Sequence, residues 1–426
     1  MSLQTLIDDA LAQTPPGRPV WVSLSGGLDS TLLLTLAADA CRRYPRPLRA
    51  LHVHHGLQAA ADDFETHCRR LGSRLGVPLY VARVGVDRDT GQGVEGAARE
   101  ARYAALARRV APGETLWLAQ HRDDQAETFL LAALRGSGVR GLAGMPSSRD
   151  WRGRRLGRPL LGVARAELED AAAHRGLAWC EDPSNIDTSL DRNFLRHRVL
   201  PLLARRWPHV GEALAQSAAL TGDAEALLET LAEEDLARLG GDPGCLPVTG
   251  LVALSAPRRR LLVRHACRRS GLPTPPSRRL ETLLGQLAAR GDAEVCLDWP
   301  GAEARVWRGT LYLMPPVMPL PVDWHADWDG ASLLVTPAGP LIGGLVHEAG
   351  EAEGLGVSPR RGGETLRLGA RGRRDLKRLL QEAGVPPWRR RRLLVVHHGA
   401  TVVAVFDPAI QGWIALAEGW SGLDQR

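Results

Sequence analysis

The chain has 426 residues, a formal net charge of +6 and 44% hydrophobic residues, which is typical of a soluble globular protein of two or three domains. Residues 1–9 carry acids and lack the basic start of a secretory signal, and no apolar run is long enough to cross a bilayer. The six cysteines form no Cys-x-x-Cys pair, which argues against a zinc ribbon, an iron–sulfur site and a disulfide framework, and predicts a cytoplasmic protein.

The first half of the chain alternates strand-like and helix-like segments. Apolar and β-branched runs predict strands at 19–24, 48–55, 78–84 and 115–120, and helical spacing predicts helices at 31–38, 63–75, 93–110 and 123–135. Repeated strand–helix units indicate a parallel sheet covered on both faces. We therefore predict an α/β, doubly wound, mostly parallel sheet over residues 1–205.

The second half is predicted to form two smaller units. A helical stretch at 193–235 leads to a glycine-rich linker at 240–244, and residues 246–313 are mainly helical with two short strands around Val295 and Val306. Prolines at 315–321 mark a boundary, and the last unit has a hairpin formed by 393–397 and 401–406. We predict a helical middle domain over 206–320 and a small α+β domain over 321–426.

The segment Ser25–Ser30, with the sequence SGGLDS, connects the first predicted strand to the helix that follows it. Gly26 and Gly27 let the backbone approach a ligand closely, and the N-terminus of the helix suits a phosphate. A carboxylate at Asp29 repels phosphates unless a divalent cation or an ammonium lies between them. An ordinary glycine turn is the alternative reading of the same residues.

Two further polar segments follow predicted strands, at 54–56 and 121–124. Because ligands bind at the carboxyl ends of parallel strands, these segments and the Ser25 turn are expected to meet in one crevice. Asp124 and Glu127 share a helix face, where carboxylates can hold Mg²⁺, receive an amine or take a proton from it. The alternative is that such acids only stabilise the helix dipole.

Three basic segments are candidate anion-binding surfaces. Arg99 and Arg102 share a helix face, although on these residues alone salt bridges to Glu95 or neighbouring carboxylates are the favoured explanation. Arg192, Arg196 and Arg198 begin a helix, for which a phosphate contact and a solvated helix start are both open. Residues 358–393 contain twelve basic residues against three acids, and this density favours RNA or another polyanion.

In their order and spacing, these segments resemble a known family. Residues 25–30 resemble the pyrophosphatase loop of enzymes that adenylate a substrate with ATP. Taken with 52–57, 93–103, 121–128, 135–138, 158–161, 181–185 and 192–193, they resemble the tRNA(Ile)-lysidine synthetases. Residues 376–392 are similar to the C-terminal domain of that family, whereas the middle unit matches only in size and helical character.

The resemblance implies ATP and Mg²⁺ as cofactors, and free L-lysine and tRNA(Ile) with a CAU anticodon as partners, with no membrane. The wobble cytidine is adenylated, and lysine then displaces AMP. Catalytic roles fall to Asp29, His121, Asp124, Glu127 and Arg99, with Asp29 and Asp124 also binding metal. ATP binding falls to Ser25, Gly26, Gly27, Leu28, Asp29, Ser30, His55 and Gly56. tRNA binding falls to Arg192, Asn193, Arg196, Arg373, Arg374, Lys377, Arg389 and Arg390.

Other functions remain open on the sequence. A related enzyme that thiolates tRNA would need paired reactive or cluster-binding cysteines, and an amidating relative would need a glutaminase cysteine and domain, neither of which the sequence contains. A non-catalytic tRNA-binding protein would not need Ser25, Gly26, Gly27, Asp29 and Ser30 to be intact. Both a monomer and a homodimer are compatible with the sequence.

Overall fold

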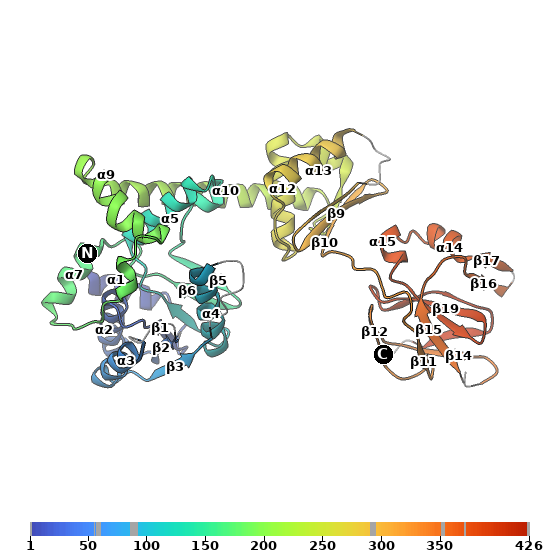
Figure 1. The fold of residues 1–426 in the computed structure, drawn as a ribbon, viewed down its shortest axis with the longest axis horizontal. Coiled ribbons are helices and arrows are strands. Elements are labelled where there is room, and N and C mark those ends of the chain that lie inside the picture. The colour runs from blue at the N-terminus through green and yellow to red at the C-terminus, as the bar shows by residue number, and fades with distance from the viewer. Residues whose placement is uncertain are drawn as a thin grey trace. The chain divides into compact units, whose positions relative to one another are not determined.

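The computed structural model describes residues 2–54, 56, 61–85, 93–289, 295–350, 354–369 and 372–423. The chain divides into two compact units, Met1–Glu229 and Thr230–Arg426, and the division lies inside the long helix α10 (Val210–Arg238). We describe each unit by itself (Figure 1). The domain limits at 205/206 and 320/321 stay predictions.

The first unit is built on a six-stranded sheet with the strand order β3-β2-β1-β4-β6-β5. All its pairings are parallel except that of β5 with β6. The strands are β1 (Val20–Ser23), β2 (Leu48–His54), β3 (Leu79–Arg83), β4 (Thr115–Trp117), β5 (Ser148–Trp151) and β6 (Arg154–Gly157). The doubly wound, mostly parallel sheet is therefore confirmed. The β5–β6 hairpin escapes sequence analysis because its strands are short and polar.

Apolar side chains cover both faces of this sheet. One cluster contains Val20, Val22 and Leu32, and a second contains Trp21 and Leu51. Successive strand residues point to opposite faces, which separates Trp21 from its two neighbours. The described helices are α1 (Leu3–Ala12), α2 (Leu28–Arg43), α3 (Ala61–Leu75), α4 (Gly93–Arg109), α5 (Arg122–Leu134), α6 (Val139–Leu142), α7 (Arg165–His174), α8 (Asp191–Phe194) and α9 (Leu200–Arg206), with a 3-10 turn η1 (Pro183–Ile186) and a π turn η2 (Leu195–Val199).

The predicted helical stretch 193–235 is broken in its first third. The run of α8, η2 and α9 ends at Arg206, and α10 begins at Val210. Trp207 leaves the helical conformation, with φ −128° and ψ 87°, because the proline at 208 disfavours a helical residue before it. The break turns the start of α10 back towards α9, which creates one wall of the cavity described below.

The second unit begins with a four-stranded antiparallel sheet of order β7-β10-β9-β8. The two strands expected around Val295 and Val306 are β8 and β9, and the sequence analysis missed β7 and β10. Helices pack on this sheet through a core that contains Leu262, Leu283 and Trp299. The elements are β7 (Cys245–Pro247), α11 (Val248–Ala253), α12 (Ala256–Arg269), α13 (Ser277–Ala289), β8 (Cys296–Trp299), β9 (Ala302–Trp307) and β10 (Thr310–Met314).

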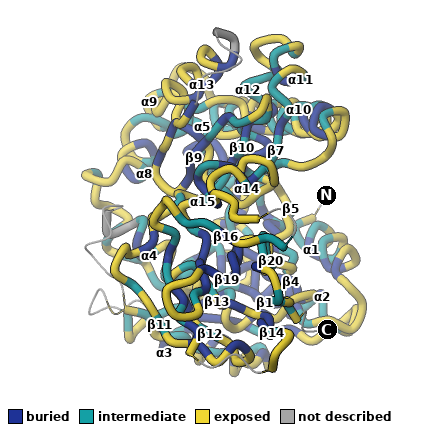
Figure 2. The backbone as a smooth tube through the Cα atoms, turned by 90° about the vertical axis from the view of Figure 1, so that its right-hand side faces the viewer, coloured by how far each residue is buried: buried dark blue, intermediate teal, exposed yellow. Residues whose placement is uncertain are grey.

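The C-terminal part of this unit centres on a five-stranded sheet of order β11-β15-β18-β19-β20. The predicted hairpin is confirmed as β18 and β19, and almost all of β19 is buried (Figure 2). The elements are β11 (Ala326–Trp328), β12 (Leu334–Thr336), β13 (Gly339–Leu341), β14 (Gly344–His347), β15 (Leu355–Pro359), β16 (Thr365–Arg367), β17 (Arg373–Asp375), α14 (Leu376–Glu382), α15 (Pro387–Arg390), β18 (Leu394–His398), β19 (Thr401–Asp407), β20 (Gly412–Leu416) and β21 (Trp420–Leu423). Among the described helices, none combines the length and the apolar character needed to span a membrane.

Candidate active site at the carboxyl ends of the parallel strands

The Ser25–Ser30 turn connects β1 to α2 and is organised by one hydroxyl group. Ser30 Oγ accepts hydrogen bonds from the N–H groups of Ser25 and Gly26, at 3.1 and 3.3 Å, and donates to the carbonyl of Gly27 at 3.1 Å. Gly27 is the N-cap of α2. The first N–H groups of a helix have no partner within it, so the turn presents donors to an anion.

Gly26 is required by its surroundings. Its φ is +93°, and a Cβ there would lie 3.1 Å from the ring of Phe64 and 3.2 Å from the sulfur of Cys68. Its carbonyl accepts a hydrogen bond of 3.0 Å from the N–H of Cys180. The back of the turn is thus packed tightly against α3 and the segment that follows α7. Leu28, the first residue of α2, sends its side chain into the core.

Asp29 is an unusual carboxylate because one of its oxygens has no hydrogen-bond partner among the residues that the structure describes. Oδ1 is buried without a hydrogen bond, whereas Oδ2 lies 3.2 Å from Nη1 of Arg165 and 3.8 Å from Nε2 of His121. Burial raises the pKa of Asp29, and the nearby positive charges of His121 and Arg165 oppose that rise. The site therefore offers a charge-bearing oxygen that a bound cation would satisfy.

His121 is the N-cap of α5 and is almost completely buried among carboxylates. Its Nδ1 lies 3.6 Å from Asp123, and its Nε2 lies 3.5 Å from Asp124. Burial acts to lower the pKa of His121, but Asp123, Asp124 and Asp29 outweigh burial and raise it above the usual value. In return His121, with the N–H of Arg165, lowers the pKa of Asp123 to about 2.

Glu127 and Asp124 form an ion-pair network with two arginines from α8 and η2. Glu127 has no exposed surface, and it accepts hydrogen bonds from Nε of Arg192 at 2.7 Å and from Nε of Arg196 at 2.6 Å. Arg196 also donates to Oδ1 of Asp124 at 3.0 Å. Both arginines were predicted to contact tRNA, and the structure turns their guanidinium groups towards these carboxylates. Their contact with tRNA stays a prediction.

A cavity of about 320 Å³ adjoins this network. It opens between α5, the start of α7, α9 and the first turn of α10, and its wall mixes acids, bases and apolar residues. The lining residues are Arg122, Asp123, Ala126, Glu127, Arg165, Arg196, Leu200, Pro201, Ala204, Pro208, His209, Val210, Gly211 and Glu212. A space of this size, with a few charged groups in an apolar wall, suits a small polar ligand.

Comparison with known proteins shows where the chain belongs. Residues 2–203 match the PP-loop domain, residues 246–312 the TilS substrate binding domain and residues 355–415 the TilS substrate C-terminal domain. The chain is 48% identical to the tRNA(Ile)-lysidine synthase of Xanthomonas axonopodis pv. citri, over 94% of this chain and 92% of that protein. The corresponding protein of Alkalilimnicola ehrlichii is 45% identical over 93% and 91%, and that of Escherichia coli O157:H7 is 41% identical over 95% of both chains.

The chain belongs to the tRNA(Ile)-lysidine synthase family. The acid–arginine network lies wholly within the match to the PP-loop domain, and the cavity extends past it into α10. The resemblance drawn from the motifs is thereby confirmed.

The remaining predicted site residues have different surroundings. His55 lies outside the described residues, whereas Gly56 has φ +64° and open space around it. The guanidinium of Arg99 lies over the ring of Tyr103, 5.1 Å from its centre. The buried amide of Asn193 donates two hydrogen bonds, to carbonyls of residues 184 and 187 at 2.9 and 3.0 Å, and so holds the loop before α8.

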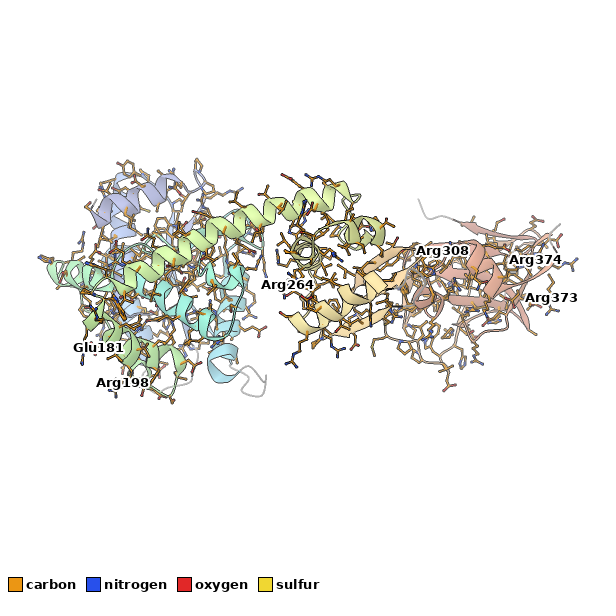
Figure 3. All side chains as sticks on the ribbon, turned by 90° about the horizontal axis from the view of Figure 1, so that it is seen from above. Glu181, Arg198, Arg264, Arg308, Arg373 and Arg374 are labelled. Carbon is orange, nitrogen blue, oxygen red and sulfur yellow. The ribbon has the colours of Figure 1, made fainter. Side chains whose placement is uncertain are left out.

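The basic C-terminal run separates into exposed and partly buried residues. Arg373, Arg374 and Lys377 are exposed, and the two arginines lie at the surface of the second unit (Figure 3). Arg389 is paired with the buried Asp407, and Nε of Arg390 donates to the carbonyl of residue 385 at 2.6 Å. The predicted roles of these residues in tRNA binding are untested by this geometry, but only the first group presents its charge to solvent.

Sequence analysis gave no site role to Arg165 and treated Asp123 as a helix-capping acid. Arg165 contacts Asp29, which is 136 positions earlier in the chain, so no local pattern could have indicated it. Asp123 carried a usable signal, because it directly follows a histidine and an arginine at a predicted strand end.

Proposed function

We propose that this protein uses ATP to join free lysine to C2 of the wobble cytidine of tRNA(Ile), forming lysidine. The relatives that it matches over more than nine-tenths of its length bear the name of that activity, and the chain is an ATP-using ligase of that type. The observation that carries the proposal is the meeting of the Ser25–Ser30 turn, Asp29 and the acid–arginine network at one sheet edge.

ATP is assigned to the Ser25–Ser30 turn. The hydroxyl groups of Ser25 and Ser30 and the first N–H groups of α2 would hold the phosphates. The cytidine O2 would attack the α-phosphorus, and pyrophosphate would leave. Arg165, 3.2 Å from Asp29, is placed to neutralise part of the charge that builds up.

Mg²⁺ is assigned to Asp29. Its Oδ1 is buried and receives no hydrogen bond from the described residues, so it can accept a cation, whereas Asp124 already accepts from Arg196 and from the N–H of His121. Among the described residues no group of three or more His, Cys, Asp or Glu side chains could hold a metal. Mg²⁺ commonly takes one or two carboxylates and completes its coordination with phosphates and water. When bound, it would offset the negative charge of the phosphates.

Free lysine is assigned to the cavity beside Glu127. Lysine carries two ammonium groups and one carboxylate, and the cavity wall supplies acids at Asp123, Glu127 and Glu212 and bases at Arg122 and Arg165. Opposite charges can therefore meet all three charged groups of this ligand. The ligand would lie directly beside the network that ends at Asp29.

The second step needs lysine as a free amine. Its nitrogen would form a bond to C2 of the adenylated cytidine, the C2–O bond would break and AMP would leave. The ammonium must lose a proton first, and we assign that proton to Asp124, whose side chain is 15% exposed, rather than to Glu127, whose side chain is 1% exposed. Arg192 and Arg196 would hold both carboxylates in place.

We also place the enzyme in the cytoplasm, where its substrates occur.

Mass analysis of tRNA tests this function. The purified protein is incubated with ATP, Mg²⁺, lysine and a tRNA(Ile) transcript with a CAU anticodon, and the digested RNA is analysed for one lysine-modified cytidine. A methionine tRNA with the same anticodon is the matched control. Lysine-dependent modification of tRNA(Ile) is expected. Pyrophosphate release without any lysine adduct, or a sulfur adduct, would contradict the proposal.

A further inference from the structure

A second cluster of arginines lies beside the site and takes no part in the carboxylate network. Arg99 and Arg102, on α4, both lie over the ring of Tyr103, at 5.1 and 5.8 Å from its centre. Arg158 follows β6, is 4% exposed, and donates to Oε1 of Gln120 and to the carbonyl of residue 146, at 2.5 and 2.8 Å. The cluster therefore stands at the carboxyl ends of β4 and β6.

Arg149 extends the cluster onto β5. It pairs with Leu156 across the β5–β6 hairpin, and Arg158 lies two positions after Leu156, so that Arg149 and Arg158 belong to the same face of the sheet. Arg149 is exposed, whereas Arg102 is half-buried. The cluster thus runs from a buried guanidinium outward to solvent.

These cations are not neutralised within the part of the chain that the structure describes. The residues that act most strongly on Arg102 are Tyr103, Arg99 and Arg192, and those that act most strongly on Arg158 are Tyr103, Arg149 and Arg99; none of these is an Asp or a Glu. Burial, together with the neighbouring arginines, lowers the pKa of both guanidinium groups. Like charges gathered in a partly buried place repel one another, and an anion that joins them relieves this repulsion.

We propose that Arg99, Arg102, Arg149 and Arg158 bind a phosphodiester of the tRNA backbone next to the nucleotide that is modified. The proposal rests on the proposed function, because it takes tRNA as the substrate. Gln120, the partner of Arg158, directly precedes His121, and Arg192 connects the cluster to Glu127. A polynucleotide whose cytidine lies at Asp29 would therefore carry its adjoining phosphates past these arginines.

RNA backbone fits this cluster better than the phosphates of ATP do. The Ser25–Ser30 turn already offers ATP the first N–H groups of α2 and the hydroxyl groups of Ser25 and Ser30. The cluster instead spreads over α4, β5 and the end of β6 and reaches solvent at Arg149, which suits successive phosphates along a strand. Arginine is also the side chain that grips phosphate through paired N–H donors.

The test measures tRNA binding against salt concentration for Arg102→Met and Arg149→Gln. Arg108→Gln is the matched control, because it removes an exposed arginine from the same helix α4 outside the cluster. Each cluster variant should flatten the slope of log affinity against log salt by about 0.7, the value for a single-stranded phosphate contact. Each should also weaken tRNA binding roughly 10-fold at moderate salt. The KM for ATP should stay unchanged in all three variants.

Thermal unfolding separates a binding role from a structural one. Removing a half-buried cation that has no acid partner should leave the melting temperature of Arg102→Met unchanged or higher, and inorganic polyphosphate should stabilise the wild type more than this variant. A raised KM for ATP with normal tRNA binding would assign the cluster to ATP instead. An unchanged salt slope in both variants, or a lower melting temperature for Arg102→Met, would overturn the proposal. Because binding is measured without turnover, a wild type that binds tRNA but forms no lysidine would refute only the proposed function.

Discussion

Replacing Glu127 by glutamine tests whether this residue holds the site together. Glu127 is fully buried and receives hydrogen bonds from Arg192 and Arg196 at 2.6 to 3.1 Å. Removing one member of a buried ion pair costs about 3–5 kcal/mol. The two arginine side chains are 27% and 26% exposed, so water recovers part of that loss. We expect a loss of about 1–2 kcal/mol for Glu127→Gln, which keeps the shape and one acceptor.

A double-mutant cycle with Arg196→Met measures the interaction itself. Unfolding by denaturant of the wild type, the two single variants and the double variant should give a coupling of about 1–3 kcal/mol. The control cycle uses Asp39 and Arg42, an exposed pair on α2 at 2.7 Å, for which we expect less than about 0.5 kcal/mol. In activity assays Glu127→Gln should raise the KM for lysine and keep lysine-independent pyrophosphate release.

Two results would refute this reasoning. A coupling between Glu127 and Arg196 no larger than that of the control pair would show that the buried network adds nothing beyond a surface contact. A variant Glu127→Gln with a normal KM for lysine and weakened tRNA binding would show that the carboxylate serves the tRNA and not the lysine end of the site.

Three further predictions follow from the same geometry. Asp29→Asn should abolish ATP-dependent pyrophosphate release without lowering the stability of the fold, because burial raises the pKa of this carboxyl; release near the wild-type rate would contradict its role. Three carboxylates outweigh burial and raise the pKa of His121 above 6.5. The positive charge of His121 therefore stabilises the fold fully below about pH 6.5, and this stabilisation is lost as the pH rises through the raised pKa. His121→Asn should remove this pH dependence from the free energy of unfolding measured between about pH 6 and 9. Replacing Arg373 and Arg374 by serine should flatten the salt dependence of tRNA binding by about one unit each, whereas Arg390→Ser should not, and equal slopes in the two variants would contradict the division into exposed and partly buried arginines.

The sequence predicts the parallel sheet and the position of the Ser25–Ser30 turn well because both depend on local signals. Apolar runs of strand length mark β1 to β4, and Gly26 and Gly27 mark the turn before α2. The partners of the arginines cannot be predicted from local signals. Arg196 meets Glu127, 69 positions earlier, and the packing of α8 on α5, with η2 following α8, brings the two together.

Charge density is an equally incomplete guide in the C-terminal part. The run 389–392 has the composition of an RNA-binding surface, yet Arg389 meets Asp407 and Arg390 meets a carbonyl of its own segment. Composition reports how many charges a segment carries. The direction of each side chain depends on acids and carbonyls that are brought near by folding.

The acid–arginine network is costly to keep, and this cost bears on what it does. Moving a charged group out of water carries a penalty of several kcal/mol for each ion, and well-packed apolar residues of the same volume often stabilise a fold as much as a buried ion pair does. Stability alone therefore gives little reason to bury Glu127 with two arginines. A ligand that carries ammonium groups into the cavity does give a reason, because carboxylates already fixed by Arg192 and Arg196 need no reorganisation when it binds. The same argument applies to Asp29, whose unpartnered oxygen is unfavourable in the free protein and becomes favourable only when a cation occupies the site.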